Sequence, residues 1–253
     1  MLENKRKLSV VVPLLNEEEN VVLLYQKLRQ ALRNQFLLYE IIFVDDGSTD
    51  GTYQLLKKLK SSDDKIIIVK FVRNFGQSAA FAAGFNIASG DLAITLDGDI
   101  QYDPEDIAQF LGKVREEGVD IVCGWRQADS LFMLIRRCPS IIANFIGSIL
   151  FGLEIHDFSC SFRAYRKNCY KSLFLGENLH RFIPIIAKFN GMVIREVRVR
   201  ILPRRRGLSK YSALRFPRVI KDALLLKISE LFFRKSYEHL FKGADFIIDT
   251  ILY

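Results

Sequence analysis

The feature that most constrains the fold is the alternation of short apolar segments with longer amphipathic ones along the N-terminal half of the chain. The apolar segments are rich in Val and Ile and have the length of strands, at 8–12, 39–44, 66–71, 91–96 and 120–123. Segments with the length and spacing of helices fill the gaps, at 18–33, 51–60, 77–88 and 104–116. This order predicts an α/β domain with a doubly wound, mostly parallel sheet.

Beyond about residue 130 the pattern changes, although no low-complexity linker separates the two parts. We expect an apolar helix at 138–153, an irregular segment at 157–163, a helix near 179–189 and a strand at 192–202. The apolar segment has about sixteen uncharged residues, and a helix that crosses a bilayer needs roughly twenty. We therefore interpret it as a buried or interfacial helix and expect no transmembrane helix.

Acidic loops follow two of the predicted strands. Asp97-Gly98-Asp99 comes directly after 92–96, and Asp45-Asp46-Gly47-Ser48 ends the strand at 39–44. In a doubly wound sheet, ligands bind beyond the carboxyl ends of the strands. A solvated turn is the alternative for either loop alone, because Asp-Gly is common in turns. Two such loops at one edge favour a ligand site, while Asp50 and Thr52 are better explained as helix caps.

The chemistry of the Asp97-Gly98-Asp99 loop favours a hard divalent cation. Gly98 lets the backbone turn so that both carboxylates reach one centre, and carboxylate oxygens suit Mg²⁺ or Mn²⁺. A cation of this kind stabilises the charge that develops on a leaving diphosphate. The three histidines, His156, His180 and His239, lack the spacing of zinc ligands, and no GxGxxG, GxxxxGK[ST] or GxSxG motif occurs.

An ordered series of motifs resembles glycosyltransferase family 2. The series is VVPLLNEEENV, EIIFVDDGSTDGT, LDGDIQYDPEDI, GWR, DFSCSFRAYRK and RRRGLSKY, and it extends from about Leu8 to about Leu226. Within the family the chain is similar to the polyprenyl-phosphate glycosyltransferases, a group that includes dolichyl-phosphate mannose synthase and bacterial undecaprenyl-phosphate glucosyltransferases. The resemblance implies a GT-A-type fold that binds nucleotide sugars.

The resemblance also implies roles for individual positions. It implies a base and ribose pocket lined by Pro13, Leu15, Glu17, Val44 and Asp46. It implies a diphosphate site formed by Asp97, Gly98, Asp99 and Gln101, with Asp97 and Asp99 as the metal ligands. Further phosphate contacts would come from Arg126, Arg204 and Lys210. Arg205 and Arg206 are either contacts or solvated charges.

Asp157 matches the acceptor-side aspartate of the family, which is proposed as a base or as an organiser of the acceptor. A lipid monophosphate has a second pKa of about 6 and is already ionised near neutral pH, so Asp157 need not be a strong base. We expect Asp157 to position the acceptor or a cation. Arg163 would pair with phosphate or with Asp157, and a purely structural Asp–Arg pair is the alternative.

The C-terminal part combines positive charge with an amphipathic pattern. Fifteen Lys or Arg against three acids lie between Arg181 and Lys235, within a net charge of +8. Apolar residues recur at helical spacing from Leu214 to Arg234 and continue into Phe232 and Phe233. We predict a catalytic domain at 1–212 and amphipathic membrane-interface helices at 213–253, with packing onto the core as the alternative.

These observations predict inverting transfer of a single sugar, glucose from UDP-glucose, to a polyprenyl phosphate. GDP-mannose-dependent mannosyl transfer and a non-catalytic nucleotide-binding or membrane-binding module are the alternatives. The QxxRW signature of processive synthases is missing, which favours one transfer over polymer building. We expect the protein to act at the cytoplasmic face of a membrane, which it would reach peripherally or through segments that this chain lacks. We expect no nucleic-acid partner, and we expect the cysteines to be buried and reduced. Homo-oligomers are possible.

Overall fold

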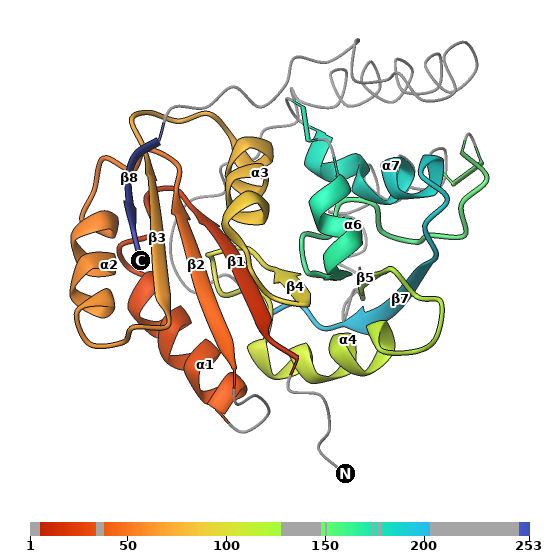
Figure 1. Ribbon diagram of the computed structural model, residues 1–253, viewed down its shortest axis with the longest axis horizontal. Helices are drawn as coiled ribbons and strands as arrows, with labels where there is room; N and C mark the ends of the chain where they lie inside the picture. The colour runs from red at the N-terminus through yellow and green to blue at the C-terminus, as the bar shows by residue number, and fades with distance from the viewer. Residues whose placement is uncertain are drawn as a thin grey trace.

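An eight-stranded sheet forms the centre of the computed structural model (Figure 1). The structure describes residues 6–33, 38–127, 148–149, 151–173, 175–176, 179–202 and 248–253. The strands are β1 (Leu8–Leu14), β2 (Tyr39–Asp45), β3 (Ile66–Phe71), β4 (Leu92–Thr95), β5 (Ile121–Arg126), β6 (Arg163–Arg166), β7 (Ile194–Val199) and β8 (Ile248–Leu252). Their spatial order is β7-β5-β6-β4-β1-β2-β3-β8.

Helices connect most of these strands. They are α1 (Val21–Arg33), α2 (Thr52–Lys60), α3 (Gln77–Ile87), α4 (Ile107–Val114), α6 (Lys167–Ser172), α7 (Ile183–Phe189), and the 3-10 helices η1 (Pro104–Asp106) and η2 (Leu179–Phe182). β1 pairs in parallel with β2 and β4, β2 with β3, and β5 with β7. The predicted α/β class and mostly parallel sheet are confirmed.

Two antiparallel strands depart from the prediction. β6 lies between β4 and β5 and runs against both of them. β8 forms the edge of the sheet and pairs antiparallel with β3, with Phe71 opposite Ile248 (Figure 1). Residues 248–252 are therefore a strand, and the prediction that helices fill 213–253 is wrong for them. The predicted helix at 214–234 lies outside the described residues.

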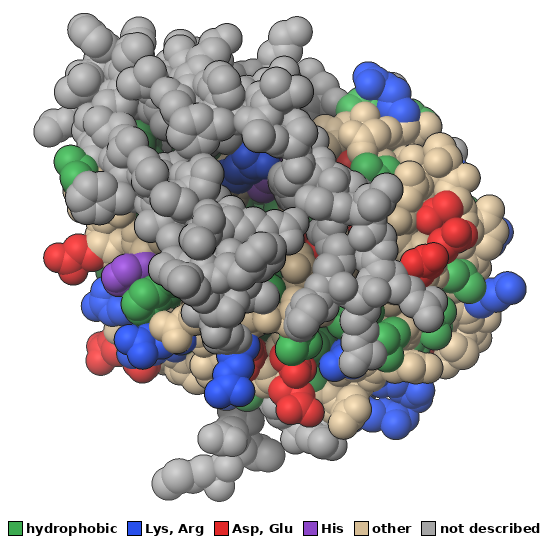
Figure 2. Space-filling model, turned by 180° about the vertical axis from the view of Figure 1, so that it is seen from behind, with side chains coloured by type: hydrophobic (Ala, Val, Ile, Leu, Met, Phe, Trp, Pro, Cys, Tyr) green, Lys and Arg blue, Asp and Glu red, His purple; other side chains and the backbone are tan. Residues whose placement is uncertain are grey.

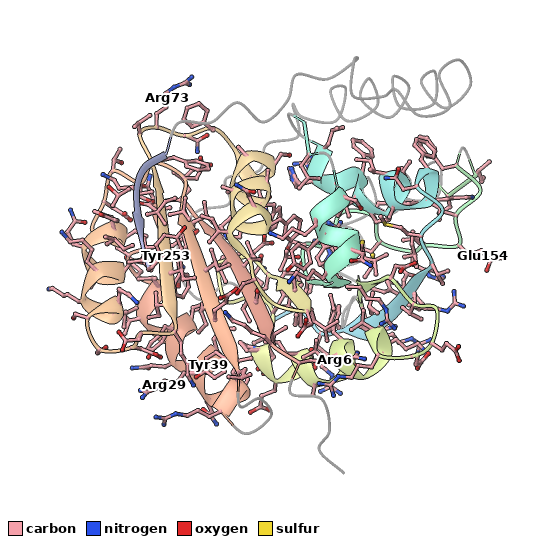
Figure 3. All side chains as sticks on the ribbon, viewed as in Figure 1. Arg6, Arg29, Tyr39, Arg73, Glu154 and Tyr253 are labelled. Carbon is pink, nitrogen blue, oxygen red and sulfur yellow. The ribbon has the colours of Figure 1, made fainter. Side chains whose placement is uncertain are left out.

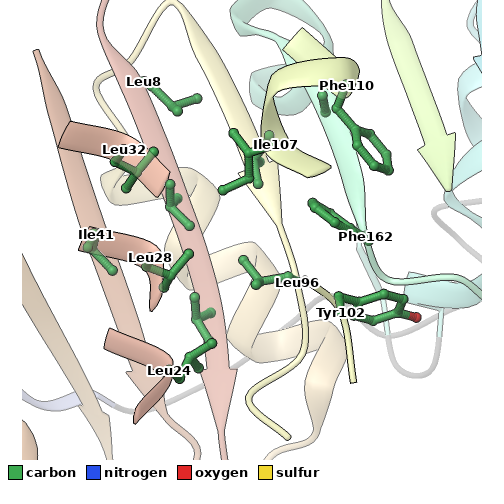
Figure 4. Close-up of a cluster of buried hydrophobic side chains, with 14 of the residues drawn as sticks. Leu8, Leu24, Leu28, Leu32, Ile41, Leu96, Tyr102, Ile107, Phe110 and Phe162 are labelled. Carbon is green, nitrogen blue, oxygen red and sulfur yellow. The ribbon is translucent and has the colours of Figure 1, made fainter. Parts of the chain in front are cut away.

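Apolar side chains alternate across β1 and fill the space on both faces of the sheet. Val10 and Val12 contribute to a cluster with α1 and α4, part of which is drawn in Figure 4. Val11 points to the other face and joins a cluster with residues of α3, α6 and α7. Because both faces of a parallel sheet are covered, its strands are almost continuously apolar. This explains the Val-rich and Ile-rich runs of the sequence.

The amino edge of the sheet is held by a buried carboxylate. Glu40, at 5% exposure, accepts hydrogen bonds from the hydroxyl of Ser9 at 2.6 Å and from the main-chain N–H of Ser89 at 2.7 Å, and it pairs with the Lys7 ammonium. Burial alone would raise the pKa of Glu40, but the bonds from Lys7, Ser9 and Ser89 lower it overall. Tyr39, the first residue of β2, lies at this end of the strands, and Arg73, which follows β3, lies at the other end (Figure 3).

The described cysteines are buried free thiols, in agreement with the sequence. Burial raises the pKa of Cys123 to about 12 and that of Cys160 to about 11, so both stay protonated near neutral pH. Cys138 lies outside the described residues. On the face shown in Figure 2, basic and acidic side chains are interspersed over the described surface. No helix within the described residues has the length and apolar character needed to cross a bilayer.

Candidate functional site

The loops that follow β1, β2 and β4 meet at the carboxyl edge of the sheet, as the sequence predicts. These strands are neighbours, in the order β4-β1-β2. The main-chain N–H of Asn16 donates to Ser48 Oγ at 2.9 Å, and Asn16 Oδ1 accepts from the main-chain N–H of Thr49 at 2.8 Å. The contacts join the loop after β1 to the acidic loop after β2.

Close packing also brings the Asp97-Gly98-Asp99 loop against the end of β1. A Cβ atom on Gly98 would lie 2.4 Å from Leu14 Cδ2, so a larger residue here would require the buried Leu14 side chain to shift. Two non-glycine residues at this edge have left-handed backbones, Asn16 at φ 52° and the buried Ile100 at φ 59°. Such a conformation is rare for a β-branched residue, and strain of this kind concentrates at functional sites.

The carboxylates of Asp97 and Asp99, on either side of Gly98, repel each other electrostatically. Asp97 Oδ1 accepts a hydrogen bond of 2.7 Å from the Gln77 side-chain amide, and Asp99 is 9% exposed. Burial and the charge of Asp99 raise the pKa of Asp97 to about 6, although Ser161, Arg126 and Gln77 act in the opposite direction. A cation at this point would relieve the repulsion.

The donor set fits a cation that binds together with a diphosphate. Within the described part of the chain, no group of three or more His, Cys, Asp or Glu side chains is arranged to hold a metal ion. Magnesium commonly binds through one or two protein carboxylates and completes its shell with water and substrate phosphates. Asp97 and Asp99 would supply such a pair of oxygen ligands.

Gln77 is a site residue that the sequence interpretation missed. It is the first residue of α3 and follows β3, which ends at the same edge as β1 and β2. Its side-chain amide donates to Asp97 Oδ1 and so orients this carboxylate. A polar residue in the first turn after a central strand was the available signal.

Asp46 supports the loop that leads into α3. It is 4% exposed, and its Oδ1 accepts the main-chain N–H of Phe75 at 2.7 Å, while its Oδ2 accepts that of Gly76 at 3.0 Å. Burial raises the pKa of Asp46 to about 6 against the lowering effect of these bonds. The carboxylate therefore connects the loop after β2 with the start of α3, and its contact with a base or ribose stays a prediction.

The raised pKa of Asp46 predicts a specific pH dependence of stability. Between the ordinary value of 3.8 and the folded value of about 6, the folded state binds more protons than the unfolded state. The unfolding free energy of the wild type, relative to Asp46→Asn, should therefore fall by up to about 3 kcal/mol as the pH rises from about 4 to about 6. Urea unfolding of both proteins across this range measures the difference, and a difference that is constant or rises with pH would contradict the assignment.

The other residues predicted for the base pocket divide into two groups. Pro13, Leu15 and Glu17 are half-buried at the end of β1, and the Glu17 main-chain N–H donates to Thr52 Oγ1 at 2.8 Å. Val44 is fully buried and packs in the cluster beneath α3. The Val44 side chain thus belongs to the core, and a role of this residue in the base and ribose pocket stays a prediction.

Arg126 forms a bidentate ion pair with Asp157. Its Nε lies 2.6 Å from Asp157 Oδ2 and its second terminal nitrogen lies 2.8 Å from Oδ1. Asp157 Oδ1 also accepts the main-chain N–H of Ser159 at 3.2 Å and the Ser159 hydroxyl at 3.1 Å. The sequence predicted that Arg126 serves the diphosphate. In the structure its guanidinium instead pairs with Asp157 and donates to the Ser159 hydroxyl.

The prediction that Arg163 pairs with phosphate or with Asp157 is wrong. Arg163 is 1% exposed in the central strand β6, and its guanidinium donates to the carbonyl oxygens of Phe158 at 2.6 Å and His180 at 2.9 Å. These bonds tie η2 to the loop that carries Asp157. Arg163 is thus a buried structural residue.

The last described residues before Arg204 lie beside the acidic loop. The main-chain N–H of Leu202 donates to the carbonyl oxygen of Gln101 at 2.9 Å, two residues after Asp99. Arg204 and Lys210 themselves lie outside the described residues, so their predicted phosphate contacts stay predictions. Gln101 is half-buried, and its main-chain N–H donates to Asp99 Oδ1 at 3.3 Å.

Comparison with protein families and curated proteins gives a consistent result. Residues 9–174 match the family described as Glycosyl transferase family 2. The chain is 38% identical over 223 residues to a dodecaprenyl-phosphate galacturonate synthase of Rhizobium johnstonii, with 86% of this chain and 65% of that protein covered. It is 36% identical to an undecaprenyl-phosphate 4-deoxy-4-formamido-L-arabinose transferase of Photorhabdus laumondii, with 88% and 68% covered. The chain thus spans about two thirds of the length of these relatives.

Solved structures show the same fold. One is glucosyl-3-phosphoglycerate synthase of Mycobacterium tuberculosis in complex with Mn²⁺, uridine diphosphate and phosphoglyceric acid, at a TM-score of 0.66 and 21% identity, with 88% of this chain and 78% of that chain covered. The predicted GT-A-type fold is confirmed.

Proposed function

Because the chain belongs to glycosyl transferase family 2, we propose that it transfers one sugar from a nucleotide sugar to a polyprenyl phosphate with inversion at the anomeric carbon. The observation that carries the proposal is the Asp97 and Asp99 pair, whose mutual repulsion calls for a cation at the edge where ligands of such sheets bind. The relatives named for dodecaprenyl and undecaprenyl phosphate support the acceptor.

In the proposed reaction, an oxygen of the lipid phosphate attacks the anomeric carbon while the bond to the donor diphosphate breaks. Asp97 and Asp99 would hold Mg²⁺ or Mn²⁺, which supplies positive charge to the leaving diphosphate. Gln77 keeps Asp97 oriented through its 2.7 Å hydrogen bond. No covalent intermediate with the protein is required.

Asp157 is suited to organise the acceptor rather than to remove a proton. Both of its oxygens already accept hydrogen bonds, from Arg126 and from Ser159. A phosphate monoester has a second pKa of about 6, so the attacking oxygen is largely ionised near neutral pH without a base. The Asp157–Arg126 pair would therefore act through its fixed geometry.

The donor that we propose is UDP-glucose, the choice that the sequence motifs favour. Galacturonate is the second candidate sugar, because a relative that is 38% identical is named as a galacturonate synthase. We further propose that 1–212 forms the catalytic unit and that part of 213–247 contacts the cytoplasmic face of a membrane. The positive charge and amphipathic spacing of that segment support the membrane contact.

Incubation with a short polyprenyl phosphate and one donor at a time tests these assignments. We expect lipid-dependent release of nucleoside diphosphate, greatest with UDP-glucose among UDP-glucose, UDP-galacturonate and GDP-mannose, and a matching glycolipid by mass spectrometry. Chelation of the divalent cation should lower the rate at least about a hundredfold. Greatest turnover with another donor would overturn the choice of glucose. Nucleotide binding without release from any donor would instead indicate a non-catalytic module.

A further inference from the structure

Glu196 contacts the turn that presents Asp157, and neither the motifs nor the proposed reaction accounts for it. Glu196 lies on β7, and its Oε1 accepts the main-chain N–H groups of His156 at 2.9 Å and Asp157 at 3.3 Å. Its Oε2 lies 2.8 Å from His156 Nδ1. A single carboxylate with a side-chain exposure of 11% thus holds both residues of this turn.

The same turn is held from the neighbouring strand. β5 and β7 pair in parallel, with Cys123 opposite Glu196 and Trp125 opposite Arg198. Arg126, the last residue of β5, holds the Asp157 carboxylate, whereas Glu196 holds the main chain of Asp157. The indole of Trp125 stacks on the His156 ring, with centroids 3.9 Å apart and planes at 14°.

Adjacent hydrogen-bonded strands fix these anchors relative to each other. We propose that Glu196 is a positioning residue, which sets the orientation of Asp157 toward the lipid phosphate by clamping the main chain of residues 156 and 157. This inference rests on the proposed function. In this proposal Glu196 contacts neither donor nor acceptor, so its effect should pass entirely through Asp157.

Kinetics of Glu196→Ala and Glu196→Gln separate positioning from general stability. Removal of the carboxylate should lower kcat about 10-fold to 100-fold, because misplacement of a reacting group by about 1 Å can reduce turnover a hundredfold. The KM for the nucleotide sugar should not change, because the donor loops lie after other strands. Glu196→Gln should retain most of the turnover, since its amide oxygen still accepts from both main-chain N–H groups. Equal losses in the two variants would overturn the proposal.

A double-mutant cycle with Asp157→Asn tests whether Glu196 acts through Asp157. If it does, Glu196→Ala should lower kcat in the wild-type background and leave it unchanged in the Asp157→Asn background. Independent, multiplied losses would contradict the proposal. Arg195→Ala is the matched control, because Arg195 is exposed on the same strand and its side chain donates to the carbonyl oxygen of the neighbouring Ile194.

Hydrogen exchange separates failure of this inference from failure of the proposed function. The amides of His156 and Asp157 should exchange faster in Glu196→Ala than in the wild type or in Arg195→Ala, whether or not a substrate is turned over. Unchanged exchange would show that Glu196 does not clamp the turn. If these amides exchange faster in Glu196→Ala but the wild type releases no nucleotide from any donor, the result would support the contact of Glu196 with the turn and refute the proposed reaction.

Discussion

Replacement of Asp97 by Asn should lower kcat/KM for sugar transfer at least about a thousandfold, which corresponds to a loss of about 4 kcal/mol of transition-state stabilisation. The substitution removes one of the two anionic ligands but keeps an oxygen that can accept the Gln77 hydrogen bond. Asp99→Asn should behave similarly. Steady-state kinetics at saturating Mn²⁺, together with titration of Mn²⁺ and nucleoside diphosphate by calorimetry, would measure both losses.

The same replacement should leave the protein at least as stable as the wild type near pH 7. Burial and Asp99 raise the pKa of Asp97 to about 6, so its ionised form costs stability above that pH and the neutral amide removes this cost. Asp64→Asn is a suitable control, because Asp64 is exposed and its contact with the Lys60 ammonium is long, at 4.0 Å. Activity of Asp97→Asn within tenfold of that control would argue against a cation site.

Replacement of Arg126 by Met should destabilise the protein by about 3 to 5 kcal/mol, the usual cost of leaving one partner of a buried ion pair uncompensated. Asp157 is almost buried, with a side-chain exposure of 6%, and loses its two shortest hydrogen bonds in this variant. Adding Asp157→Asn should recover much of the stability, since no charge is then left unpaired. Urea unfolding of the single and double variants measures these differences.

Turnover should not recover with stability. The double variant lacks the fixed geometry that we assign to the pair, so its kcat should remain about a hundredfold below that of the wild type. Asp157→Asn alone should also lose turnover, and near-normal activity with donor and lipid phosphate would rule out a functional role for Asp157. A double variant that regains both stability and turnover would reduce the pair to a structural contact.

The sequence predicts the acidic edge of the sheet because two rules act together there. Val-rich and Ile-rich strands that alternate with helices imply a parallel sheet, and parallel strands bring Asp46 and Asp97 to the same edge. The rules concern only local pattern and chain order. Both are visible without any knowledge of side-chain contacts.

The partners of Arg126 and Arg163 could not be predicted from the sequence. Arg163 begins a four-residue strand with charged residues at both ends, RAYR, which lacks the apolar run that marks the other central strands. Its antiparallel insertion between β4 and β5 buries it, and Arg126 takes the partner that was assigned to Arg163. The ion pair joins residues 31 positions apart, and no spacing rule relates them. β8 was missed because its pairing with β3 depends on the course of the whole chain.

The buried carboxylate of Glu40 has a consequence for how this scaffold can diversify. Glu40, Ser9 and Ser89 satisfy one another at the amino edge, at the opposite end of the strands from Asp97. One set of stabilising contacts therefore lies away from the loops that would distinguish one sugar from another, and substitutions in those loops leave these contacts in place. A fold organised in this way can acquire new specificity by changing one edge alone. Relatives named for galacturonate and for formamido-arabinose, at 38% and 36% identity, are what such evolvability would produce.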